Sequence, residues 1–265
     1  MLPPEVVYDL AGILDISDKA FIVGGQALNL WAERYNAIPA LEAYGPYTSK
    51  DIDYFGHREA AEKLAEALGG EVHVPAPGDH TFQTAMVVAS VGGQSIEIDF
   101  IGHVKGVDDN QLFKQAVELR MKVRLPDERT GELIVPIMHP FHCLQSRLAN
   151  VVDLERGSAL AKNQLEASPI VLRAYLSELL DAGKHRHVTG VLQALHAYLK
   201  SDITGRKAHH FMANDPLDVL QSFREDERLD ARWRERSLAP MIEGLHSRRK
   251  AVAARRKKMS RSRER

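Results

Sequence analysis

The sequence lacks the features that mark several classes of protein. It contains one cysteine, Cys143, so an internal disulfide is excluded, and it has no Cys-x-x-Cys pair of the kind that holds structural zinc or serves in redox chemistry. No segment approaches the roughly 18 consecutive apolar residues of a membrane span. The amino-terminal segment MLPPEVVYDL lacks the basic and apolar regions of a signal peptide. We therefore expect a cytoplasmic protein with no membrane partner, in which Cys143 belongs to the core.

The composition is otherwise that of an ordinary globular protein. Of the 265 residues, 44% are apolar and 27% are charged, which suffices for one large core or two modest ones. The formal charge of −1 conceals an asymmetry, because residues 247–265 hold ten of the 35 Lys and Arg residues and one acid, Glu264. The rest of the chain therefore carries 25 basic and 35 acidic side chains, a net charge of −10. We expect residues 247–265 to form a solvated, mobile tail after a helical start.

Strand and helix patterns alternate over the first part of the chain. Gly92-Gly93 suits a tight hairpin turn between two strands, and residues 117–125 alternate between apolar and charged side chains as a half-buried strand does. Helical patterns separate the first strands. The strands are expected at 21–23, 51–55, 81–91, 94–101, 117–125 and 131–137, and the helices at 26–35 and 58–68. This order predicts an α/β (α+β) domain with a mixed sheet over residues 1–139.

The pattern changes beyond Pro140, where helical spacing predominates and strand signals are few. Helices are expected at 141–152, 170–180, 188–199 and 217–223. We therefore place a helical domain at residues 140–246, followed by the basic tail.

Gly24-Gly25 stands where the first strand meets the following helix. Without side chains, two such glycines let backbone N–H groups approach phosphate oxygens at the positive end of a helix. A tight turn with no ligand is the more common explanation of a lone Gly-Gly pair. The pair therefore indicates a phosphate-binding site only if other ligand-binding residues lie near it in the fold.

Asp51 and Asp53 are two residues apart in an expected strand, so both carboxylates point to the same face while Ile52 enters the core. Two like charges this close are costly unless a cation lies between them. Mg²⁺ suits that place because it takes hard oxygen ligands and fills its other positions with water and substrate phosphates. A solvated strand end is the alternative explanation.

Asp99 lies in a second alternating strand, where Ile98 and Phe100 face the other way. A third carboxylate beside the first pair would permit two metal ions. One ion would lower the pKa of an attacking hydroxyl and the other would stabilise a leaving pyrophosphate. Asp99 is then the candidate to contact the activating metal or to act as a base.

The order of these motifs resembles the polymerase-beta-like nucleotidyltransferase superfamily. That family has an apolar-Gly-Gly segment, a helix, Asp-x-Asp on a strand and a separate apolar-Asp-apolar strand. Thr48-Ser49-Lys50-Asp51-Ile52-Asp53 looks most like the toxin-type members related to abortive-infection proteins. The resemblance covers residues 18–165 and implies Asp51, Asp53 and Asp99 as catalytic and metal-binding residues.

The resemblance also implies a set of nucleotide-binding residues, and here the chain departs from the family. Gly24, Gly25 and Ser49 match the family's positions, whereas Arg147 stands where these relatives usually have a lysine that reaches the triphosphate. Arginine keeps the charge and can clamp phosphate oxygens, although an exposed helix arginine is an equal alternative. Lys162, in Lys162-Asn163-Gln164, is carried over from a weak match.

These residues lead to one expectation and one alternative. We expect an Mg²⁺-dependent enzyme that moves a nucleoside monophosphate from an NTP to a hydroxyl, with an RNA or tRNA end as acceptor. As the family's toxin-type members suggest, it would act as a toxin of a toxin–antitoxin system with an antitoxin protein as partner. The basic tail would bind RNA by counterion release, although a solvated terminus explains it equally well. The alternative is a non-catalytic fold of this type that binds nucleotide, nucleic acid or a partner protein.

Overall fold

A computed structural model describes residue 10 and residues 12–47, 52–76, 78–91, 93–124, 130–155 and 157–263, without the side chains of 123, 124, 130 and 256–263. The chain divides into two compact units, Met1–Val171 and Leu172–Arg265. The division falls within one helix, α7 (Ala159–Asp181). Each unit is described by itself below.

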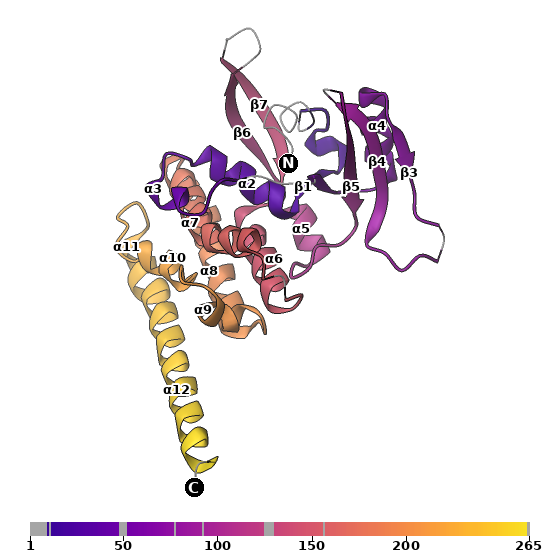
Figure 1. Cartoon of the computed structure of the whole chain (residues 1–265). Helices are drawn as coiled ribbons and strands as arrows, with labels where there is room; N and C mark the ends of the chain where they lie inside the picture. Colours follow the sequence, from indigo (N-terminus) through magenta and orange to yellow (C-terminus); the bar gives the residue numbers. More distant parts are fainter. Residues whose placement is uncertain are drawn as a thin grey trace. The chain divides into compact units, whose positions relative to one another are not determined.

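The first unit is built on a seven-stranded mixed sheet with the strand order β3-β4-β5-β2-β1-β7-β6 (Figure 1). The pairs β2·β5 and β1·β7 are parallel and the other neighbours are antiparallel. The strands are β1 (Phe21–Val23), β2 (Ile52–Phe55), β3 (Glu71–His73), β4 (Gln83–Val91), β5 (Gln94–Ile101), β6 (Val117–Arg124) and β7 (Thr130–Ile137). The mixed α/β fold expected from the sequence is confirmed.

Alternation sets which side of β5 and of β6 is buried. In β5, Ile96, Ile98 and Phe100 are buried while Glu97 between them is exposed. In β6, Leu119 is buried and Arg120 is exposed, and the strand pairs with β7. The apolar side chains that recur at every second position of these strands therefore enter the core, as the alternation in the sequence predicted.

Helices connect and cover these strands. They are η1 (Ile16–Asp18), α2 (Gly24–Arg34), α3 (Pro39–Glu42), α4 (Arg58–Leu68), α5 (Asp109–Lys114), α6 (Pro140–Val152) and the first part of α7. The segment between α2 and β2 contains the short helix α3, which Pro39 begins and in which Leu41 is buried. At α6, the His139 side chain accepts a hydrogen bond from Phe141 N and caps the helix, with Pro140 at its first position. α2 and α6 pack against each other.

The second unit is helical, which confirms the helical carboxyl-terminal part expected from the sequence. It contains the rest of α7, then α8 (His185–Ser201), η2 (Gly205–Lys207), α9 (Ala208–Phe211), α10 (Leu217–Ser222), α11 (Ala231–Trp233), the π-helical turn η3 (Arg234–Leu238) and α12 (Ala239–Arg263). α8, α10 and α12 contact one another around Leu192, Leu195 and Leu220, which are fully buried. α12 extends as helix to Arg263, through the segment expected to be a mobile tail.

No helix among the described residues combines the length and apolar character that crossing a membrane requires.

Candidate functional site

Asp53 and Asp99 lie opposite each other on neighbouring parallel strands. β2 pairs with β5 so that Ile52 faces Ile98 and Asp53 faces Asp99. Residues in register on adjacent strands point to the same face, and the strands are about 4.8 Å apart. Both aspartates are half-buried, whereas the flanking isoleucines are fully buried. The structure thus brings together two of the three expected carboxylates, and Asp51 and Ser49 lie outside the described residues.

Gly24 lies directly against the Asp53 carboxylate. β1 runs antiparallel to β2 with Val23 opposite Asp53, so the chain enters α2 beside that side chain. Gly24 has φ of +70°, and a Cβ atom on it would lie 2.5 Å from Asp53 Oδ2. The backbone conformation at this position therefore favours glycine, and a Cβ atom here would also force the Asp53 carboxylate to move.

The first turn of α2 has no side-chain cap from its N-cap residue. The helix follows Val23, whose apolar side chain cannot cap it, and its first turn contains no acidic residue. The amino-terminal amides of a helix carry partial positive charge and favour an anion. Carboxylates for a cation and amides for an anion thus lie next to each other, which suits a metal-bound phosphate.

Gln83 holds Asp99 in place from the neighbouring strand. Its Nε2 donates a short hydrogen bond to Asp99 Oδ1. The register of β4 against β5 shifts between Gln83 and Ala85, and this irregularity stands where Gln83 enters the strand. A hydrogen bond to one carboxylate oxygen fixes the orientation of the Asp99 side chain.

Gln164 connects Gly25 to Arg147. The Gln164 Oε1 atom accepts a hydrogen bond from Arg147 Nη1 at 3.1 Å. Its Nε2 donates to Asn29 Oδ1 at 3.1 Å and to Gly25 O at 3.4 Å. A Cβ atom on Gly25 would lie 2.8 Å from Gln164 Nε2 and 3.4 Å from Arg147 Nη1. The guanidinium that the resemblance assigns to the triphosphate therefore lies beside the Gly-Gly segment, held there by a buried amide.

Lys162 behaves differently from its neighbour Gln164. Lys162 is exposed on the first turn of α7, whereas Gln164 is buried, with 4% of its surface exposed. The same three-residue segment thus presents one side chain to solvent and another to Gly25.

Sequence reasoning missed three polar side chains at this site. Asn29 could have been found, because it follows Gly25 by four residues on one helix and so lies on the same face. Gln164 lay within a segment that was singled out for its lysine. Gln83 gave no signal, since only the irregular register of β4 brings it to Asp99.

The carboxylate oxygens of Asp53 and Asp99 are the type of ligand atom that binds a divalent cation. Two half-buried carboxylates in register repel each other unless a proton or a cation lies between them. Hard carboxylate oxygens are the ligands that Mg²⁺ takes, and it needs only one or two of them with substrate phosphates. Within the described ranges no group of three or more His, Cys, Asp or Glu side chains is arranged for a metal ion, and Asp51 falls outside those ranges.

Comparison of the sequence with protein-family models and with curated proteins gives no match. The sequence motifs and the geometry of Gly24, Asp53 and Asp99 are therefore the observations that bear on function.

Proposed function

We propose that the protein is an Mg²⁺-dependent nucleotidyltransferase, which transfers a nucleoside monophosphate from an NTP to a hydroxyl group. The observation that supports this proposal best is the register of Asp53 against Asp99, with Gly24 touching Asp53 at the amino-terminal end of α2. A structural role alone would not explain why two like charges are held in register beside a helix end that attracts anions.

Each residue of the site has a part in that reaction. The backbone N–H groups at Gly24 and Gly25 would bind triphosphate oxygens. Arg147, positioned by Gln164, would neutralise charge on the same phosphates. Asp53 and Asp99 would hold Mg²⁺, which when bound stabilises the charge of the transferred phosphoryl group and acidifies a nearby hydroxyl. Ser49, Asp51 and Lys162 complete the set by resemblance to the family.

The transfer itself is an in-line displacement. The acceptor oxygen forms a bond to the α-phosphorus while the bond from that phosphorus to the bridging oxygen of the β-phosphate breaks. Pyrophosphate leaves with the electron pair, and the acceptor hydroxyl loses its proton. Asp99, which accepts a hydrogen bond from Gln83, would receive that proton directly or through water.

We further propose an RNA end, such as that of tRNA, as the acceptor. The resemblance to toxin-type relatives supports this choice and implies an antitoxin protein as a partner. Ten Lys and Arg residues in the last 19 positions agree with a polyanionic substrate.

The decisive experiment tests each NTP donor in turn against several classes of acceptor. The protein is incubated with Mg²⁺, total cellular RNA and each α-³²P-labelled NTP in turn, and label is sought on RNA, protein and small molecules. Asp53→Asn, which keeps the shape of the side chain and removes its charge, is the control. Label that requires Asp53 establishes the transfer and identifies donor and acceptor.

A second measurement separates catalysis from binding. Calorimetric titration with Mg²⁺ and NTP should show binding to the wild type that Asp53→Asn weakens. Nucleotide binding without label in any fraction would favour a non-catalytic binding module. No effect of Asp53→Asn on either binding or transfer would overturn the proposal.

A further inference from the structure

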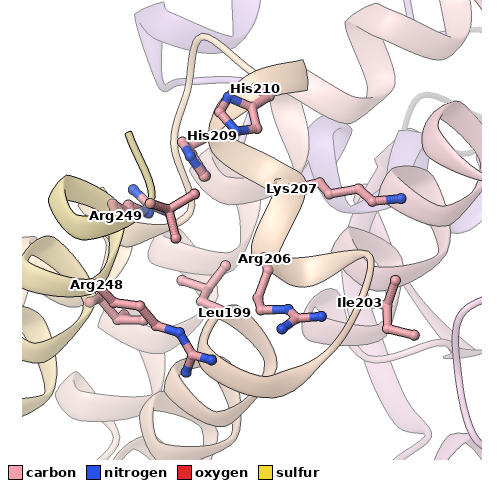
Figure 2. A pocket seen from close by; sticks show the side chains of 10 residues that line it. Leu199, Ile203, Arg206, Lys207, His209, His210, Arg248 and Arg249 are labelled. Atoms are coloured by element: carbon pink, nitrogen blue, oxygen red, sulfur yellow. The ribbon is translucent and has the colours of Figure 1, made fainter. Parts of the chain in front are cut away.

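The second unit contains a basic cavity of about 300 Å³ (Figure 2). Its residues come from the end of α8, from the η2–α9 segment and from α12. They are Leu199, Ile203, Arg206, Lys207, His209, His210, Leu245, Arg248, Arg249 and Val252. We refer to these residues as the basic pocket.

The charge of the basic pocket is largely uncompensated. Arg249 forms an ion pair with Asp215. Within the described part of the chain, Arg206, Lys207 and Arg248 form no ion pair with a carboxylate, and Arg206 Nε donates only to the backbone oxygen of Asp202, at 3.2 Å. Figure 2 shows Arg206 and Arg248 on either side of Leu199, reaching from different segments. Cations brought together in this way repel one another unless an anion joins them.

Close packing of a glycine fixes this arrangement. Gly205 is buried, and a Cβ atom on it would collide with the carbonyl oxygen of Tyr198 in α8. The turn η2 can therefore lie directly on α8, which holds Arg206 and Lys207 at the rim of the pocket. The Asp202 side chain reinforces the turn by accepting hydrogen bonds from Thr204 N and Gly205 N, both at 2.8 Å.

The pocket combines its cations with apolar and aromatic surface. Ile203 is 67% exposed, and the exposed ring of His210 lies 3.8 Å from that of His209, measured between centroids. Exposed aromatic rings and guanidinium planes are the surfaces on which unpaired bases stack, and arginine side chains clamp phosphate. A nucleotide unit, which links a phosphate to a flat base, could contact both the cationic side chains and the apolar and aromatic side chains of the basic pocket.

Charge continues from the pocket along α12. The helix contains Lys250 and Arg255, followed by Arg256, Lys257, Lys258, Arg261 and Arg263. Its 25 residues span about 37 Å at a rise of 1.5 Å per residue. A small phosphorylated molecule would engage only the pocket, whereas a polynucleotide would also engage the helix. The continuity of positive charge therefore favours a polyanion.

We propose that the basic pocket binds a backbone phosphate of single-stranded RNA, which continues along α12. The choice of RNA rests on the proposed function, whereas the binding itself requires neither NTP nor Mg²⁺. The site extends the RNA-binding surface from the terminal segment into the folded unit, with Arg206 and Arg248 as its principal contacts.

The test measures RNA affinity of the full chain in the absence of NTP and Mg²⁺. A fluorescein-labelled single-stranded RNA of about 20 nucleotides is titrated by anisotropy between about 50 and 200 mM salt. The double variant Arg206→Gln, Arg248→Gln removes two cations from the pocket. The matched control Arg58→Gln, Arg232→Gln removes two exposed arginines elsewhere, and circular dichroism checks that both variants fold.

We expect the pocket variant to lose at least about tenfold in affinity, and the slope of log K against log salt to fall by about 0.7, the contribution of one phosphate on a single strand. The control should change affinity by less than about twofold. Equal losses in both variants, or no loss in the pocket variant, would overturn the proposal. Equal affinity for DNA of the same sequence would overturn the choice of RNA. Pocket-dependent binding to anionic lipid vesicles without RNA binding would assign the site to a membrane surface instead.

The Asp53→Asn variant separates this inference from the proposed transfer. It should bind RNA like the wild type, because Asp53 belongs to the other unit. If the labelling reaction showed no transfer, the RNA-binding result would still stand. If the pocket variant bound RNA like the wild type, the transfer proposal would still stand.

Discussion

Gly24 places a backbone with φ of +70° against the Asp53 carboxylate, where a Cβ atom would lie 2.5 Å from Oδ2. Gly24→Ala must therefore bear both a left-handed backbone and a collision, unless Asp53 moves. We expect the free energy of unfolding to fall by about 1–3 kcal/mol and NTP binding to be lost. Urea denaturation and calorimetry would measure the two effects.

The chain offers a matched control for this substitution in Gly69. Its φ is +62°, similar to that of Gly24, but a Cβ atom there would meet nothing within 4 Å. Gly69→Ala should therefore carry the backbone cost alone, about 1 kcal/mol, and leave NTP binding intact. Equal effects at the two glycines would show that contact with Asp53 has no special importance.

Asp53 itself should matter for activity and not for folding. Asp53→Ala removes one of two like charges held in register, so the melting temperature should stay the same or rise. Transfer should be abolished, because a ligand for Mg²⁺ is lost. Scanning calorimetry and the labelling reaction would measure both, and turnover close to that of the wild type would refute the role of Asp53.

His142 makes stability depend on pH. The side chain is 2% exposed in α6, and burial lowers its pKa to about 4 from 6.5. Between these values the unfolded chain binds a proton that the folded chain does not, so the stabilising effect of neutral His142 is complete above pH 6.5 and is lost toward pH 4. The loss should be on the order of 3 kcal/mol.

Urea denaturation at several pH values would show this contribution. His142→Asn should flatten the dependence between pH 4 and 6.5, whereas the exposed His80→Asn should not. An unchanged acid slope in His142→Asn would assign the pH dependence to other groups.

At the scale of elements, Gln164 ties three helices together at the candidate site. It joins α7 to Asn29 and Gly25 of α2 and to Arg147 of α6. Gln164→Leu removes these three hydrogen bonds, one of them to the buried Asn29, which should cost about 1–3 kcal/mol of stability. Because Arg147 would lose its positioning bond, KM for NTP should rise more than kcat falls.

Lys162 is the comparison for Gln164, since it lies two residues away and is exposed. Lys162→Ala should leave stability within about 0.5 kcal/mol of the wild type. If Lys162 reaches the triphosphate, as the resemblance implies, its KM for NTP will also rise. A raised KM in Gln164→Leu alone would place the phosphate contacts at Arg147.

Helices and strands could be predicted from the sequence where a local pattern of side chains was enough to identify them. The alternation in β5 and β6 identified the strands and their buried faces, because half-buried strands obey a period of two. The helical spacing predicted a helix only at residues 170–180, whereas α7 begins at Ala159 and continues through Pro169, a residue type that often interrupts helices. In α12, runs of Ala, Arg and Lys favour helix by intrinsic propensity, although nothing apolar suggested burial.

The site depended more on tertiary structure. Alternation predicts the face of the strand on which Asp53 and Asp99 each lie. It does not predict that the two residues lie opposite each other, because that depends on the register in which β2 and β5 pair. Likewise, Gln83 reaches Asp99 only because the register shifts at that end of β4. Long-range hydrogen bonds such as those of Gln164 leave no periodic trace in a sequence.

At the scale of the whole molecule, charge is distributed unevenly along the chain. Residues 1–246 carry a net charge of −10, and the ten basic residues beyond them all lie after Ser247. The structure divides this basic segment in two, because Arg249 pairs with Asp215 and Val252 lines the basic pocket, whereas residues 256–265 follow the pocket. Truncation at two points should therefore have different effects.

A chain ending at Arg255 loses six Lys and Arg residues and Glu264, a net charge of +5, without losing a residue of the basic pocket. Its melting temperature should match that of the full chain, while RNA affinity and its salt dependence should fall. A chain ending at His246 also loses Arg248, Arg249 and Val252, so Asp215 is left without its arginine. This chain should melt several degrees lower and bind RNA more weakly still. If the two truncated chains had equal melting temperatures and equal RNA affinities, the start of the basic segment would contribute neither packing nor phosphate contacts, and the pocket would have no part in RNA binding.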